Sequence, residues 1–175
     1  MMPMPSARET ELLEAAYRYA LTHGLADLSL RPLAAAIGSS TRVLLYLFGS
    51  KDGLVRALLA RARADELELL ADIGTGPQVV ERLWEWLSMP AHRPLLTLWL
   101  EAYARSLVEP DGPWAGFARA TVDDWLEVLA SAQPADVRDT AEGLAERTRT
   151  LALLRGALLD LLATGDGERV SAALG

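Results

Sequence analysis

Apolar residues recur along this chain at spacings of three and four positions, which is the period of amphipathic α-helices. No segment alternates apolar and polar residues in the way that a half-buried strand does. Ser6 followed by Glu9 predicts a capping box at the start of the first helix, and Gly24 ends that helix. Before residue 74 the pattern predicts four helices, at 7–23, 30–37, 41–48 and 51–73.

Helices also account for the second half of the chain. Prolines stand at or near the breaks in the pattern, as helix boundaries require, and the short connections favour antiparallel packing of neighbours. The helices expected in this half are 78–88, 92–109, 114–132, 136–163 and 168–174. The predicted fold class is therefore all-α, with a three-helix N-terminal domain followed by a C-terminal helical bundle.

Charge is divided unevenly between these two parts. The net charge of the chain is −7. Residues 1–63 nevertheless carry eight basic and five acidic side chains, a balance of +3, which leaves −10 for the remaining residues. A basic head on an acidic body suits a protein whose N-terminal part meets a polyanion.

Composition argues against several classes of function. The chain has no cysteine, which excludes disulfides, thiolate metal sites and cysteine nucleophiles, and its two histidines argue against zinc and triad sites. We find no nucleophile, phosphate-loop or cofactor motif, so we expect no enzyme, no cofactor and no metal. The start of the chain lacks the apolar stretch of a signal peptide, and no apolar run could span a bilayer. A soluble cytoplasmic protein is expected.

Segment 29–48 has the build of a helix-turn-helix, because two short helices flank a turn that contains Gly38. Six apolar side chains are expected to face inward: Leu33, Ala34, Ile37, Val43, Leu44 and Phe48. The outer face of the second helix then presents Ser40, Thr41, Arg42 and Tyr46, a set suited to base edges and phosphates. The alternative is an ordinary helical hairpin with a polar outer side.

Lys51 is the only lysine of the chain and lies in the first turn of the fourth predicted helix. A cation at a helix N-terminus opposes the helix dipole, unless an anion is expected there. A helix N-terminus with a lysine is a phosphate site, although an incidental surface lysine would give the same sequence.

The run from Leu33 to Leu54, LAAAIGSSTRVLLYLFGSKDGL, resembles the DNA-binding signature of the tetracycline-repressor (TetR) family, I-A-x-x-A-G-V-S-x-x-T-L-Y-x-x-F-x-S-K-x-x-L. The resemblance covers about the first 60 residues. It departs from the family pattern in helix 41–48, where Leu45 replaces the usual tyrosine and Tyr46 supplies the aromatic group one place later. Leu47 stands where a polar or aromatic group is common.

The resemblance implies a homodimeric regulator, most often a repressor, that leaves a palindromic operator in double-stranded DNA when a small molecule enters its second domain. Lys51 matches the family's phosphate-binding lysine. Ser29 and Arg31 match the start of the first helix of the helix-turn-helix, which contacts the DNA backbone or a base. Thr41 and Arg42 match the variable positions that contact bases. The implied division is a DNA-binding domain at 1–53 and a ligand-binding and dimerisation domain at 54–175, with helix 51–73 as the connecting lever.

The C-terminal part contains all five tryptophans, at or beyond residue 84. Aromatic side chains mixed with small or hydroxyl residues are typical of an apolar pocket with a few polar anchors, although the same stripes are also typical of a plain core. Candidate ligand-binding residues are Trp84, Leu87, Trp99, Tyr103, Phe117 and Thr121, with His92, Arg105 and Arg155 for polar or charged contacts.

Helix 136–163 carries leucines on more than one face, so one face is expected to meet its own domain and another a partner subunit. Gly156 and Ala157 would allow a close approach. We expect a symmetric four-helix interface made by helices 114–132 and 136–163 of two subunits.

The function predicted from the sequence is ligand-responsive transcription regulation. An activator, or a helical adaptor that does not bind DNA, is the alternative. An enzyme working in the same pocket is disfavoured, because the neighbouring carboxylates Asp123 and Asp124 diverge on a helix.

Overall fold

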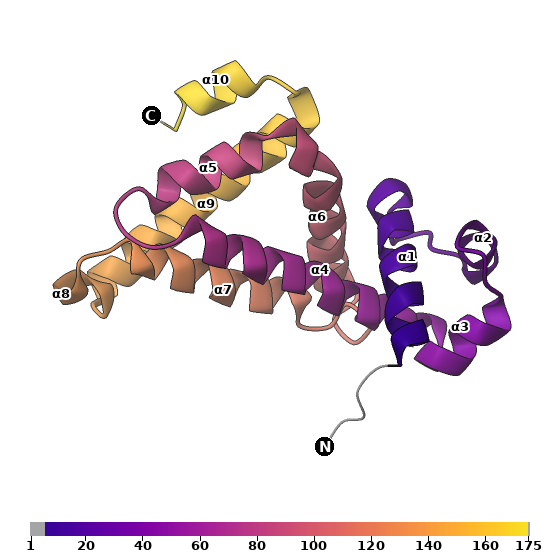
Figure 1. Cartoon of the computed structure of the whole chain (residues 1–175). Helices are drawn as coiled ribbons and strands as arrows, with labels where there is room; N and C mark the ends of the chain where they lie inside the picture. Colours follow the sequence, from indigo (N-terminus) through magenta and orange to yellow (C-terminus); the bar gives the residue numbers. More distant parts are fainter. Residues whose placement is uncertain (1–5, 175) are drawn as a thin grey trace. The chain divides into compact units, whose positions relative to one another are not determined.

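The computed structural model describes residues 6–174, and within them the chain is helical with turns and no strand (Figure 1). The elements are α1 (Ala7–His23), α2 (Leu30–Ala36), α3 (Thr41–Phe48), α4 (Lys51–Ile73), α5 (Val79–Ser88), the 3₁₀ turn η1 (Pro90–His92), α6 (Arg93–Val108), α7 (Phe117–Ser131), α8 (Ala135–Arg138), α9 (Ala141–Thr164) and α10 (Gly167–Ala172). The all-α fold class predicted from the sequence is confirmed.

The N-terminal helices begin and end close to their predicted positions because local signals set them. The Ser6 hydroxyl accepts a hydrogen bond from the Glu9 N–H at 3.1 Å, which is one half of the predicted capping box. Gly24 follows α1 with φ of 78°, a left-handed conformation that glycine adopts without steric cost. Short polar caps and glycine therefore explain why α1 needs no tertiary contact to define its ends.

Two predicted boundaries in the C-terminal half are wrong. The helix expected at 136–163 is two helices, because α8 ends at Arg138 and the Thr140 hydroxyl caps α9 by accepting from the Gly143 N–H at 3.0 Å. The helix expected at 114–132 begins only at Phe117, after a turn in which Gly116 has φ of 75°.

The helices group into two compact units. Of the described residues, one unit comprises 6–65 together with Thr97–Ala118. Within it, α2 packs on both α1 and α3. The core beneath them contains Tyr17, Leu33, Leu44, Leu58 and Phe117. Burial of these side chains positions α3, which is only eight residues long and could not be stable alone.

The other unit comprises Glu66–Leu96 and the residues from Arg119 onward. Helix α9 is its centre and packs against α5, α8 and α10, which Figure 1 draws in magenta, orange and yellow respectively. Its core includes Leu83, Leu87, Leu151, Leu154 and Leu158. The predicted functional division at residues 53 and 54 stays a prediction.

None of the helices formed by residues 6–174 combines the length and the apolar character that a membrane crossing requires. The lack of a signal peptide was predicted from the start of the chain, of which residues 1–5 lie outside the described part.

Candidate nucleic-acid interface

The turn between α2 and α3 is a tight one, as a helix-turn-helix requires. Gly38 has φ of 64°, and the Ser39 N–H donates to the Ala34 carbonyl at 2.8 Å. The Ser40 hydroxyl then accepts from the Val43 N–H at 3.2 Å and caps α3. The sequence therefore encodes both the reversal of the chain and the start of the second helix locally.

The outer face of α3 is exposed. Arg42 is exposed, Tyr46 is 85% exposed and Thr41 is half-buried. Val43, which we expected to face inward, is 37% exposed, because the face of α3 that meets the core is the one bearing Leu44. The expectation for Val43 is therefore wrong, and α3 presents more apolar surface than its sequence pattern suggested.

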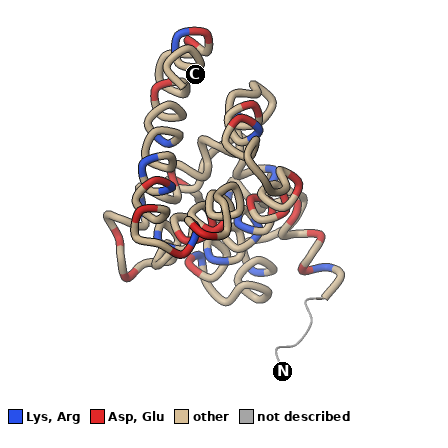
Figure 2. Tube along the Cα trace, turned by 90° about the vertical axis from the view of Figure 1, so that its left-hand side faces the viewer, with Lys and Arg blue, Asp and Glu red and all other residues tan. Residues whose placement is uncertain are grey.

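Segment 28–51 is free of acidic residues, although the chain as a whole has a net charge of −7. Its three charged side chains, Arg31, Arg42 and Lys51, are all exposed. Figure 2, in which acidic positions are red, shows such positions spread along much of the rest of the trace. A wholly cationic segment on an acidic protein is electrostatically complementary to a polyanion.

The starts of α2 and α4 place further polar groups on the surface. Ser29 occupies the N-cap position of α2, but its exposed side chain makes no capping hydrogen bond. At the start of α4, the Ser50 hydroxyl accepts from the Gly53 N–H at 2.9 Å, and the exposed Lys51 side chain lies in the first turn. The Ser50 hydroxyl satisfies the Gly53 N–H. The first-turn N–H groups that precede it have no intrahelical partner, so with the Lys51 side chain they can hold an anion.

A partly buried network of side chains connects α1 to α4. The Tyr17 hydroxyl donates to Asp65 at 2.8 Å, and Arg61 is ion-paired with Asp65 and, at 2.5 Å, with Glu14. The Arg61 guanidinium also lies 5.0 Å from the centre of the Tyr17 ring. Burial, and then the bond to Asp65, raise the pKa of the Tyr17 hydroxyl well above its usual range. The Tyr17–Asp65 hydrogen bond and the Arg61–Glu14 ion pair hold the middle of α4 against α1.

The loop between α1 and α2 is held by a carboxylate from α6. Glu101 accepts hydrogen bonds from the Leu25 N–H, at 2.8 Å, and from the Ala26 N–H. A side chain at Gly24 would meet the Glu101 carboxylate at 3.0 Å. Sequence reasoning missed Glu101, since nothing in its own helix distinguishes it from an ordinary surface glutamate.

Replacement of Glu101 by alanine is expected to lower the free energy of unfolding by about 1–3 kcal/mol, because two backbone N–H groups lose a charged acceptor. Urea denaturation followed by circular dichroism measures the change. Glu101→Gln keeps one carbonyl acceptor and should lose less. Glu109→Ala, which removes only a surface ion pair with Arg105, should change stability by less than about 1 kcal/mol. Equal losses in Glu101→Ala and Glu109→Ala would contradict the assignment.

Four of the predicted ligand-binding residues lie in the unit that contains the helix-turn-helix: Trp99, Tyr103, Arg105 and Phe117. The rings of Trp99 and Tyr103 stack with centroids 5.2 Å apart, and Phe117 is buried in the core against which Trp99 packs. Arg105 pairs with Glu109 at 2.5 Å. Trp99 and Tyr103 thus form a stacked pair, with Trp99 packed on the core of this unit, and the role of all four residues in ligand binding stays a prediction.

The other five lie in the second unit: Trp84, Leu87, His92, Thr121 and Arg155. Leu87 and Thr121 are buried, and the Trp84 indole N–H donates to the Ser171 hydroxyl at 2.9 Å, which fastens α10. His92 stacks on Trp86 with ring centroids 3.9 Å apart. Trp84 and His92 thus have structural partners of their own.

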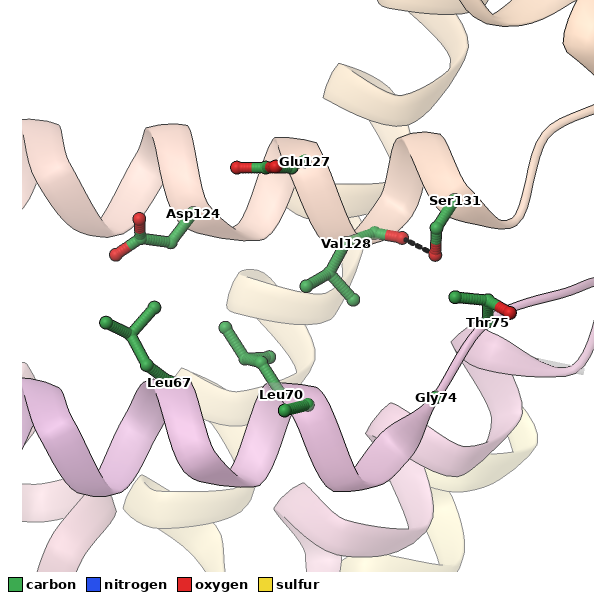
Figure 3. Close-up of a pocket in the computed structure, with 9 residues that line it drawn as sticks. Leu67, Leu70, Gly74, Thr75, Asp124, Glu127, Val128 and Ser131 are labelled. Carbon is green, nitrogen blue, oxygen red and sulfur yellow. Dashed lines mark hydrogen bonds between the residues drawn. The ribbon is translucent and has the colours of Figure 1, made fainter.

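A groove of about 280 Å³ runs between the end of α4 and α7 within the second unit. Figure 3 shows Leu67 and Leu70 pointing across it toward α7, with Asp124 and Glu127 on the α7 side. None of the nine predicted ligand-binding residues lines this groove. Its apolar floor and acidic side are chemically suited to an apolar group or an organic cation.

Glu66 is a second functional candidate that sequence reasoning missed. It is only 5% exposed, and its carboxylate accepts from the Trp125 indole N–H at 2.5 Å. Its position carried a signal, because it falls on the buried stripe of α4 between Ala62 and Leu70, where an apolar residue is expected. Among residues 6–174 no three His, Cys, Asp or Glu side chains gather to hold a metal ion.

Comparison with solved structures shows that this fold is shared over almost the whole chain. A candidate transcriptional regulator from Saccharomonospora viridis in complex with choline superposes with a TM-score of 0.75 at 20% identity, over 95% of this chain and 93% of the other. A candidate TetR-family regulator from Rhodococcus sp. gives 0.74 at 19% identity, over 97% and 95%. The multidrug binding protein EbrR with proflavin gives 0.69 at 24% identity, over 95% and 97%.

The sequence comparisons concern the N-terminal part. A search of curated proteins finds no significant match. Residues 12–58, which include the helix-turn-helix and the start of α4, match the family described as bacterial regulatory proteins, tetR family. The resemblance noted in the sequence is thus confirmed for residues 12–58, and the fold of the chain is similar to that of a candidate TetR-family regulator.

Proposed function

We propose that this chain is a ligand-responsive DNA-binding regulator of transcription, and specifically a repressor that a small molecule releases from its operator. The observation that carries the proposal is the exposed cationic surface formed by Arg31, Arg42 and Lys51 on segment 28–51, which has no acidic residue. Such a surface is complementary to the phosphates of a duplex. The protein acts by binding rather than by catalysis, in the cytoplasm where the DNA lies.

The expected contacts follow from the exposure of each group. Ser29, Ser40 and Lys51 reach phosphates, because hydroxyls and cations at helix starts are typical phosphate ligands. Arg42 and Thr41 approach base edges from the outer face of α3. Tyr46 replaces the usual tyrosine one position later, and its exposed ring lies beside Arg42 on that face.

The operator is proposed to be palindromic because the regulator is proposed to be a dimer. An eight-residue α3 spans only a few base pairs, so useful specificity requires two half-sites. The outward face of α9 offers the contact, together with α7. On it Ala152 and Gly156 lie between Leu153 and Leu159, and all four are exposed.

Trp99, Tyr103, Arg105 and Phe117 lie in the first unit and stay predicted contacts. The effector is proposed to bind in the second unit, with Trp84, Leu87, His92, Thr121 and Arg155 as its candidate contacts. The bound effector shifts the population toward a conformation in which the two DNA-binding domains of the proposed dimer no longer match the spacing of the half-sites. The free energy that couples effector binding to DNA binding is about 1–3 kcal/mol. Helix α4 is continuous from Lys51 to Ile73 and is the proposed lever. Choline and proflavin, the molecules bound to two proteins of similar fold, are rational first probes.

The proposal predicts that duplex affinity falls steeply with salt and that Lys51→Ala makes the fall shallower. Each phosphate contact releases about one counterion, so the slope of log affinity against log salt should drop by about two per dimer. Fluorescence anisotropy with a labelled duplex at several salt concentrations measures this slope. Affinity for all sequences should fall by a similar factor.

Lys51→Arg is the matched control, since it keeps the charge and should keep most of the slope. An unchanged slope in Lys51→Ala would remove Lys51 from the interface. A wild-type protein without salt-dependent affinity for any duplex would contradict the regulator and favour a helical adaptor.

A further inference from the structure

The exposed arc of α3 is mostly apolar. Successive residues of an α-helix are 100° apart, so Leu45, Arg42, Tyr46 and Val43 follow one another around the outward side in that order. Leu45 is 42% exposed, Tyr46 85% and Val43 37%. Arg42 is the only charged side chain on this arc.

Exposed apolar groups on a helix that meets DNA need a chemical partner. In the major groove the bases present hydrogen-bond donors and acceptors, with a single exception, the 5-methyl group of thymine. An isopropyl, an isobutyl or the face of a phenol ring can exclude water from that methyl group but cannot discriminate donors from acceptors. The exposed arc of α3 is therefore chemically complementary to the 5-methyl group of thymine.

A duplex fits this arc better than a protein partner does. The apolar side chains lie within the acid-free segment 28–51, between the exposed cations Arg31, Arg42 and Lys51. Cations around a small apolar patch oppose the approach of another copy of this segment, because like charges would meet. A polyanion with apolar methyl groups in its groove satisfies both features.

The axial distances between these side chains place the contacted thymines close to the base pair that Arg42 contacts. Helical rise is about 1.5 Å per residue, so Arg42 and Tyr46 are about 6 Å apart along the axis, which is roughly two base-pair steps. Leu45 and Val43 lie on opposite sides of the line joining them. Thymines on either side of the base read by Arg42 are thus within reach.

From this arrangement the geometry points to a thymine-methyl reader: Val43, Leu45 and the Tyr46 ring contact 5-methyl groups that flank the guanine bound by Arg42 in each half-site. This inference rests on the proposed DNA-binding function and deepens it by naming the bases. The apolar contacts then add to the specificity that the bidentate arginine supplies, and the arginine sets the register.

The test begins with selection of binding sites from a randomised duplex pool by the full-length protein. Thymines next to the shared guanine are then replaced one at a time by uracil, which removes only the methyl group. Each replacement at a contacted thymine should lower affinity about three- to fivefold, and replacement in both half-sites about tenfold or more. Uracil at thymines outside the half-sites is the control and should leave affinity unchanged.

Val43→Ala, Leu45→Ala and Tyr46→Ala complete the test, because all three side chains are exposed and their truncation spares the core. For at least one variant, replacing thymine by uracil at one position of the half-site should leave the affinity unchanged. Equal affinity of the wild type for thymine and uracil sites would overturn the inference while leaving the regulator intact. Selected sites without thymine beside the guanine, or variants that all keep the wild-type ratio, would also overturn it. If the protein selects no duplex, the proposed function fails and the inference fails with it.

Discussion

Arg42→Ala is expected to lower operator affinity about a hundredfold or more while changing affinity for unrelated duplex much less. A bidentate arginine–guanine contact contributes about 1–3 kcal/mol of discrimination, and a dimer makes two such contacts. The exposed position of Arg42 on α3 leaves its guanidinium available for this role. Anisotropy measurements on the selected site and on a scrambled duplex give the two affinities.

Two further variants separate base reading from charge. Arg42→Lys keeps the charge but not the planar fork, so it should retain non-specific binding and lose most of the specificity. Lys51→Ala should lose affinity for both duplexes alike. If Arg42→Ala weakened binding to both duplexes by the same factor, Arg42 would be a phosphate contact and the base assignment would be wrong.

If the proposed dimer forms through α7 and α9, Gly156→Glu is expected to make the protein monomeric at micromolar concentration and to reduce operator affinity by a factor of about 10² or more. A Cβ at Gly156 meets no atom within 4 Å apart from its chain neighbours and the nearby backbone of its own helix, so the subunit has room for the side chain. Across the proposed α7–α9 interface, two carboxylates would be buried close to each other without partners. A monomer contacts only one half-site and so loses the gain in affinity that comes from joining two DNA-binding domains, which is a factor of about 10²–10⁴.

This variant should not harm the fold, because glycine within a helix is less stable than other residues by up to about 1 kcal/mol. Sedimentation velocity measures the association state, and circular dichroism measures the helix content. Leu107→Glu is the control, since Leu107 is 66% exposed on α6 and lies outside the proposed interface. A Gly156→Glu protein that remains dimeric would place the interface elsewhere.

Much of the N-terminal part could be predicted because its signals are local. The serine caps at Ser6 and Ser40 and the left-handed glycines at Gly24 and Gly38 act on backbone within four residues of themselves. The break after α8 was missed because α8 is a single turn whose sequence continues the helical period. Thr140 can cap α9 only because the chain leaves the helical conformation before it, and the helical period of the sequence does not indicate that break.

The candidate site divides in the same way. Lys51 and Arg42 could be proposed from position in a short helix and from the signature that surrounds them. Val43 was placed inward because an apolar residue beside Leu44 is usually buried, yet α3 has too little core contact to cover both. Exposure of a side chain depends on neighbouring helices, which a single helix pattern does not contain.

The amino-acid sequence by itself determined the helical period, the turn of the helix-turn-helix and the cationic segment 28–51, because each depends on residues close together in the chain. Tertiary structure alone decided that Glu101 holds the backbone of Leu25 and Ala26, and that Glu66 is buried against Trp125. These partners are separated by 59 to 76 residues. A glutamate has the same helix propensity whether it faces water or a distant backbone, so only the packing of the helices distinguishes the two.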